Sequence, residues 1–83
     1  MLGIVLALDR RFEEAVPLLQ RSLEETVSPR QRAARSFYLG ASLAELGRPA
    51  EAKAALAVAA SLGGRFGELA RERMLLPAAV PFR

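Results

Sequence analysis

The chain has 83 residues, 52% of them hydrophobic, with a net charge of +3 and neither cysteine nor histidine. This length allows one small domain. The absence of cysteine and histidine excludes disulfides, thiolate catalysis, zinc–sulfur sites and the commonest general base. We therefore expect no enzyme, no metal site and no cofactor. Alanine and leucine are abundant, and both are strong helix formers, so the composition predicts an all-α fold.

The apolar residues 1–8 predict a short first helix that turns near Asp9 and Arg10. A secretory signal would need a positive start, a longer apolar run and a small-residue cleavage site. No stretch approaches the ~18–20 apolar residues of a membrane span. We therefore expect a chain without a membrane span and a cytoplasmic location.

The second predicted helix runs from about Arg11 to Thr26. Its apolar residues follow the i, i+3, i+4, i+7 spacing of one buried helix face. These residues are Phe12, Ala15, Val16, Leu19 and Leu23. Pro17 lies beyond the first turn, where it removes one backbone hydrogen bond and is expected to bend the helix slightly.

Start and stop signals delimit the third predicted helix, over about Arg30–Leu46. Ser28 can cap its start, and Pro29 fits the first turn. Gly47 provides the left-handed position that ends a helix.

Two further helices follow in the same way. Pro49 fits the first turn of a helix that runs to about Leu62, where Gly63 and Gly64 stop it. A last helix is expected from about Phe66 to Leu76, within a capping segment 65–76, and Pro77 ends it. The tail 78–83 has no periodic pattern and is expected to be loose.

An internal repeat groups these helices into two copies. Residues 1–24 align with residues 38–61 at an offset of 37, with more identities in consistent order than chance would give. The repeated residues of the first copy are Leu2, Gly3, Leu6, Ala7, Arg11, Glu14, Ala15 and Leu19. Each copy therefore predicts a pair of helices around a tight turn.

On these residues the chain resembles the tetratricopeptide repeat family, whose pattern contains L-G-x2-Y followed by A-x3-F. Leu39-Gly40-x2-Leu43 and Ala52-x3-Leu56 match this pattern in the second copy. Leu2-Gly3-x2-Leu6 and Ala15-x3-Leu19 match it in the first. Gly3, Gly40, Ala15 and Ala52 are small where the helices of a pair are expected to cross closely.

The resemblance implies a right-handed α-solenoid of antiparallel helix pairs in one domain, residues 1–77. Repeat one would cover 1–27, repeat two 28–63, and the capping helix 65–76. The sequence departs from the family at Ser36, where Trp is common, and in its period of 37 instead of 34. The longer period implies a longer turn between the repeats.

The resemblance also implies a partner-binding groove lined by the first helix of each pair. The implied groove residues are Ile4, Leu8, Ala34, Phe37, Ala41, Ala44 and Glu45. They are mostly apolar and lack the Lys and Asn with which one subclass of the family clamps a peptide's terminal carboxylate. The groove therefore suits an apolar peptide or partner helix. The competing interpretation makes Phe37 and Tyr38 core residues between adjacent helices.

These observations predict a protein–protein interaction scaffold. A solenoid end is normally polar, but Met1, Ile4, Val5 and Leu8 are apolar. We therefore also expect a homodimer or missing upstream repeats to cover this end.

A basic cluster provides the alternative, a helical nucleic-acid-binding or regulatory domain. Arg30, Arg32 and Arg35 could contact phosphates. The competing interpretation is a solvated helix face on which glutamates partner the arginines. Because phosphate binding takes several aligned cations, nucleic acid is the less favoured partner.

Overall fold

The computed structural model describes residues 2–25 and 28–75. Five helices form this part of the chain, and it contains no strand. They are α1 (Leu2–Leu8), α2 (Phe12–Glu25), α3 (Pro29–Glu45), α4 (Pro49–Leu62) and α5 (Gly64–Leu75). The all-α prediction is therefore confirmed, and the helix ends lie within about two residues of those expected. The predicted helix ends at Thr26 and Leu76 and the tail 78–83 fall outside the described residues.

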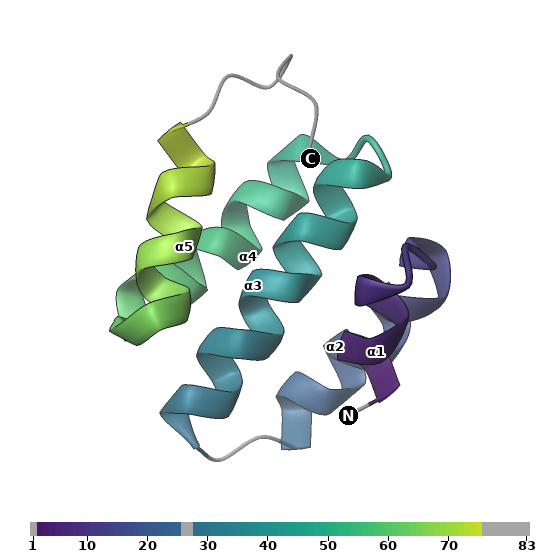
Figure 1. The fold of residues 1–83 in the computed structure, drawn as a ribbon, viewed down its shortest axis with the longest axis horizontal. Coiled ribbons are helices and arrows are strands. Elements are labelled where there is room, and N and C mark those ends of the chain that lie inside the picture. The colour runs from purple at the N-terminus through teal and green to yellow at the C-terminus, as the bar shows by residue number, and fades with distance from the viewer. Residues whose placement is uncertain (1, 26–27, 76–83) are drawn as a thin grey trace.

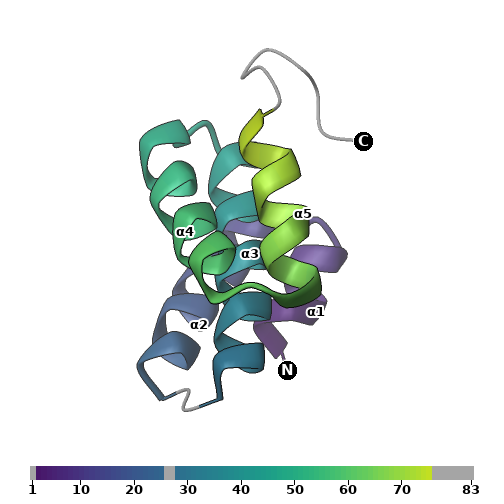
Figure 2. The same ribbon diagram turned by 90° about the vertical axis from the view of Figure 1, so that its left-hand side faces the viewer.

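The helix α3 lies at the centre of the molecule and contacts each of the other four helices. Figure 1 shows α1 and α5 on opposite sides of α3. Figure 2 shows α2 and α4 along one side of the molecule and α1 and α5 along the other, with α3 between them. The arrangement is that of two helical hairpins, α1–α2 and α3–α4, followed by a single helix.

The two hairpins turn in the same way at positions 37 residues apart. The amide of Arg11 donates to the carbonyl of Leu6 at 2.9 Å, and the amide of Arg48 donates to the carbonyl of Leu43 at the same distance. Both bonds close the turn after the first helix of a hairpin. The sequence repeat is therefore also a repeat of local structure.

The turn position that ends the first helix of each hairpin has a positive φ. Gly47 holds it in the second copy with φ 75°, and Arg10 holds it in the first with φ 63°. The predicted left-handed glycine is thus confirmed. Arg10 adopts the same conformation at a steric cost, and its guanidinium lies 5.9 Å from the centroid of the Phe12 ring.

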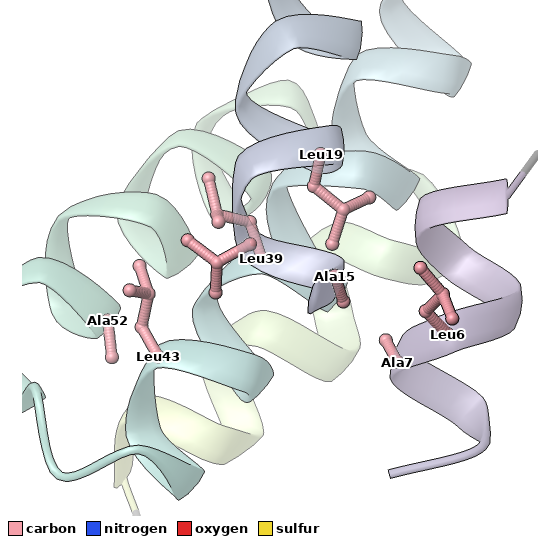
Figure 3. Close-up of a cluster of buried hydrophobic side chains, with 8 residues drawn as sticks. Leu6, Ala7, Ala15, Leu19, Leu39, Leu43 and Ala52 are labelled. Carbon is pink, nitrogen blue, oxygen red and sulfur yellow. The ribbon is translucent and has the colours of Figure 1, made fainter. Parts of the chain in front are cut away.

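The main core joins α1, α2, α3 and α4 (Figure 3). Its buried residues are Leu6, Ala7, Ala15, Val16, Leu19, Leu39, Leu43 and Ala52. The predicted buried face of α2 is confirmed at Ala15, Val16 and Leu19, whereas Phe12 and Leu23 are half-buried. Burial of each large apolar side chain stabilises the fold by roughly 1.5–3 kcal/mol.

A smaller core connects α5 to the second hairpin. Leu56 and Ala59 of α4 and Ala70 of α5 are buried together, and Phe37 of α3 packs against them. The last helix therefore covers the side of α3 that faces away from α1.

Two local expectations have different outcomes. Ser28 occupies the N-cap position of α3, but its side chain forms no capping hydrogen bond. Its carbonyl accepts the amide of Arg32 at 2.9 Å, the ordinary first bond of the helix, so the N-cap position is confirmed and the side-chain cap is not. Pro17 lies inside α2, and the helix continues beyond it to Glu25.

Candidate partner-binding face

The implied groove residues lie on α1 and α3, but the structure exposes them to very different degrees. Leu8 is 66% exposed, and Ala44 is exposed as well. Ile4, Ala34, Phe37 and Glu45 are half-buried, and Ala41 is buried. Among the implied groove residues, the exposed apolar side chains are therefore Leu8 of α1 and Ala44 near the end of α3.

Phe37 belongs to a cluster of three aromatic rings. Its ring centroid lies 5.4 Å from that of Tyr38 and 5.9 Å from that of Phe66 in α5. The rings of Tyr38 and Phe66 are 5.8 Å apart. These separations are typical of favourable aromatic packing. The structure therefore favours the interpretation of Phe37 as a packing residue between α3 and α5.

Ala41 is only 6% exposed, so its assignment to the groove surface needs correction. It lies one turn after Phe37, on the same face of α3. The sequence pattern could not show this burial because it depends on how the helices pack. Ala41 contributes close packing instead of ligand contact.

Glu45 ends α3 on the same side, and its charge acts on Arg73 of α5. Burial lowers the pKa of the Arg73 guanidinium, while the carboxylate of Glu45 acts in the opposite direction and raises it. Burial is the larger effect, so the pKa of Arg73 stays below its ordinary value. Glu45 is thus not an isolated acid at the edge of the face.

Val5 is the residue that the groove prediction left out, although its apolar character was noted. It is 56% exposed. Ser42 stands 37 residues later, at the equivalent place in the second hairpin, and is completely buried. This difference follows from the arrangement, because α3 has α1 and α5 on its two sides whereas α1 contacts only α2 and α3 among the described helices. We call Val5 and Leu8 of α1 the candidate partner-binding face.

The basic cluster of α3 is not a uniform solvated row. A guanidinium nitrogen of Arg35 donates to the carbonyl of Ser22 in α2 at 3.1 Å. Arg35 is therefore engaged in joining the two hairpins. Arg30 is exposed near the start of α3, and a nearby pocket is described below.

One glutamate in the first turn of α2 and one in the first turn of α4 form local ion pairs. Glu14 pairs with Arg11, and Glu51 pairs with Arg48 in the equivalent place. A hydrogen bond from Arg11 to Glu14, together with the attraction between their charges, raises the pKa of Arg11. No group of three or more acidic side chains that could hold a metal ion occurs among residues 2–25 and 28–75.

Within the same part of the chain, no helix is both long and apolar enough to span a membrane. Compared with protein-family models, with curated proteins and with solved structures, the chain has no match. The tetratricopeptide resemblance therefore rests on the residues of this chain alone.

Proposed function

We propose that the protein is a non-catalytic interaction module of the tetratricopeptide type that binds an apolar peptide or partner helix. The observation that carries this proposal is the exposure of Val5 and Leu8, at 56% and 66%. Both are large apolar side chains on one short helix. Two adjacent apolar side chains of this kind are a natural contact for a protein partner.

The internal repeat supports the same conclusion. Ser42 is completely buried, while Val5, its counterpart in the first hairpin, is more than half exposed. A partner that lies against α1 would give Val5 the burial that Ser42 has. Full burial of a Val or Leu side chain contributes about 1.5–3 kcal/mol, but association costs several kcal/mol. A partner must therefore contact more of the surface than Val5 and Leu8 alone.

Peptide selection tests the proposal directly. A displayed library of about 16-residue peptides, long enough for a helix of some four turns, is selected on the protein. Selected peptides are then titrated by calorimetry against the native chain and the variants Leu8→Glu and Val5→Glu. We expect each variant to bind at least about tenfold more weakly, because a charge would be buried against the apolar peptide.

Arg21→Glu is the matched control, because Arg21 is exposed on α2, away from the partner-binding face. It should bind the selected peptides like the native chain. Peptides that bind Leu8→Glu as tightly as the native chain would contradict the proposal. So would affinity that falls steeply with salt, since that dependence is typical of phosphate binding.

Self-association would use the same face, with a second copy as the partner. Sedimentation velocity over a range of concentrations detects it before any peptide is added. The double variant Val5→Glu/Leu8→Glu should then sediment as a monomer. An oligomer that persists in this variant would place the self-association on another surface.

A further inference from the structure

A pocket of about 430 Å³ lies at one end of the molecule, apart from the partner-binding face. The start of α3 and the turn between α4 and α5 form it, and Figure 1 shows α3 and α5 beginning at the same end. Its lining residues are Pro29, Arg30, Ala33, Leu62, Gly63, Gly64, Arg65 and Phe66. We call it the terminal pocket. Its volume falls within the range of small-molecule sites.

The charged lining of the terminal pocket is entirely positive. Arg30 comes from α3 and Arg65 from α5, and no carboxylate is among the lining residues. Both arginines are exposed, so each can reorient toward a ligand without leaving an ion pair buried. Guanidinium groups form strong, often bidentate, hydrogen bonds with carboxylates and phosphates. The pocket therefore favours an anion.

The remaining side chains give the pocket an apolar wall. Ala33 is buried, and Leu62 and Phe66 are half-buried. Their carbon surfaces offer no hydrogen bond, so they favour an apolar group over a hydrated ion. A ligand that satisfies both parts of the lining must carry an acidic group on an apolar body.

The backbone at the turn adds to this preference. Gly63 and Gly64 have no side chains, and a Cβ added at either would meet no atom within 4 Å. The backbone there borders open space. The first amides of α5 also have no carbonyl one turn earlier within the helix to accept them, which gives this end a partial positive charge.

We propose that the terminal pocket binds a small organic carboxylate, with its acid group between Arg30 and Arg65. Its apolar group lies against Ala33, Leu62 and Phe66. The carboxylate comes either from a free acid or from the terminal residue of a peptide, and the chemistry of recognition is the same. This inference concerns a site separate from the proposed partner-binding face and does not depend on it.

The molecule contains its own optical reporter for this site. Phe66 lines the pocket, and its ring lies 5.8 Å from that of Tyr38. The chain has one tyrosine and no tryptophan. A ligand that displaces the Phe66 ring should therefore change the fluorescence of Tyr38.

The test compares hexanoate with hexanamide, which has the same apolar chain but no charge. Both are titrated into the full chain, and binding is followed by Tyr38 fluorescence and by the amide NMR signals of Gly63 and Gly64. We expect hexanoate to bind at least about tenfold more tightly than hexanamide. The shifts should centre on the terminal pocket and leave Val5 and Leu8 unchanged.

Arginine variants test whether Arg30 and Arg65 bind the carboxylate group. Arg30→Gln and Arg65→Gln should each weaken hexanoate binding about tenfold and leave the helical circular dichroism unchanged. Arg71→Gln is the matched control, since Arg71 is exposed on α5 and does not line the pocket. Equal binding of hexanoate and hexanamide would overturn the proposal. So would Arg30→Gln and Arg65→Gln variants that bind hexanoate as well as Arg71→Gln does.

A second pair of probes distinguishes the two sources of the carboxylate. An acetylated tripeptide ending in leucine is compared with the same peptide amidated at its C-terminus. Preference for the free peptide over both its amide and hexanoate assigns the site to a peptide terminus. Preference for hexanoate over the peptide assigns it to a free acid.

Discussion

Gly40 of α3 lies so close to Leu56 of α4 that a Cβ added to the glycine would stand 2.7 Å from the leucine Cγ. The first hairpin repeats this relationship, because a Cβ at Gly3 would stand 2.9 Å from the Cγ of Leu19. Real Cβ atoms essentially never approach a neighbour this closely. The helices of each pair therefore cross at a glycine, with a leucine filling the space that the absent side chain leaves.

Replacing Gly40 with alanine should destabilise the fold. Overpacking a core typically costs about 1–3 kcal/mol, and alanine recovers only about 1 kcal/mol through its better helix propensity. The carbonyl of Ala52, 3.1 Å from the added Cβ, limits how far α4 can adjust. We expect a net loss of about 1 kcal/mol in the free energy of unfolding, measured by urea denaturation.

A double-mutant cycle provides the control for that prediction. Leu56→Ala alone should cost about 2–5 kcal/mol because it leaves a cavity. In Gly40→Ala/Leu56→Ala the new methyl group enters part of this space, so the combined loss should be smaller than the sum of the single losses. Strictly additive losses would show that Gly40 and Leu56 do not share this contact.

The two hairpin turns predict different responses to substitution at the residue with positive φ. Gly47→Ala places a Cβ at φ 75° and should lower the free energy of unfolding by about 1 kcal/mol. Arg10→Gly relieves the same strain in the first turn but loses the contact with Phe12, worth about 0.5–1 kcal/mol. It should therefore leave stability nearly unchanged. Thermal and urea denaturation measure both, and a large loss in Arg10→Gly would argue against strain at this turn.

Arg35 should matter for stability more than an exposed arginine does. Its hydrogen bond to the Ser22 carbonyl joins α2 to α3, and hydrogen bonds from charged groups contribute about 1.5–3 kcal/mol. We expect Arg35→Gln to lower the free energy of unfolding by about 1–2 kcal/mol, since glutamine is shorter and neutral. Arg71→Gln, on the exposed side of α5, should change it by less than about 0.5 kcal/mol. Equal effects of the two variants on the free energy of unfolding would show that the Arg35 hydrogen bond does not stabilise the fold.

Truncating two neighbouring residues of α1 should change the free energy of unfolding by very different amounts. Leu6 is 8% exposed within the main core, so Leu6→Ala should cost about 2–5 kcal/mol. Val5 is on the other side of the helix, and Val5→Ser should change stability by less than about 0.5 kcal/mol. Circular dichroism during urea denaturation separates the two. A large loss in Val5→Ser would mean that Val5 is already covered in the free protein.

The sequence was sufficient to predict the helices and the repeat, because both depend on the spacing of residues along the chain. Proline and glycine mark helix ends by their backbone geometry, as at Pro29 and Gly47. The offset of 37 also anticipated the close approach at Gly3 and Gly40. Ser28 occupies the predicted N-cap position, but its hydroxyl forms no capping hydrogen bond. Residue type and position alone do not fix the orientation of that side chain.

The candidate site was only partly predictable. Leu8 and Ala44 are exposed as a groove requires, yet Ala41 is buried. Helical spacing identifies which residues share a face, but it does not say which neighbouring helix covers that face. The docking of α5 decided which residues cover Phe37.

The sequence by itself determined five helices, two equivalent turns and the small residues at which the helix pairs cross, since these depend on residues within a few turns of each other. Only the tertiary structure decided that Val5 is exposed while its counterpart Ser42 is buried. It alone brought Arg30 and Arg65 to one pocket. Both results depend on how separate helices pack side by side, and that placement is fixed by burial of apolar surface across the whole chain.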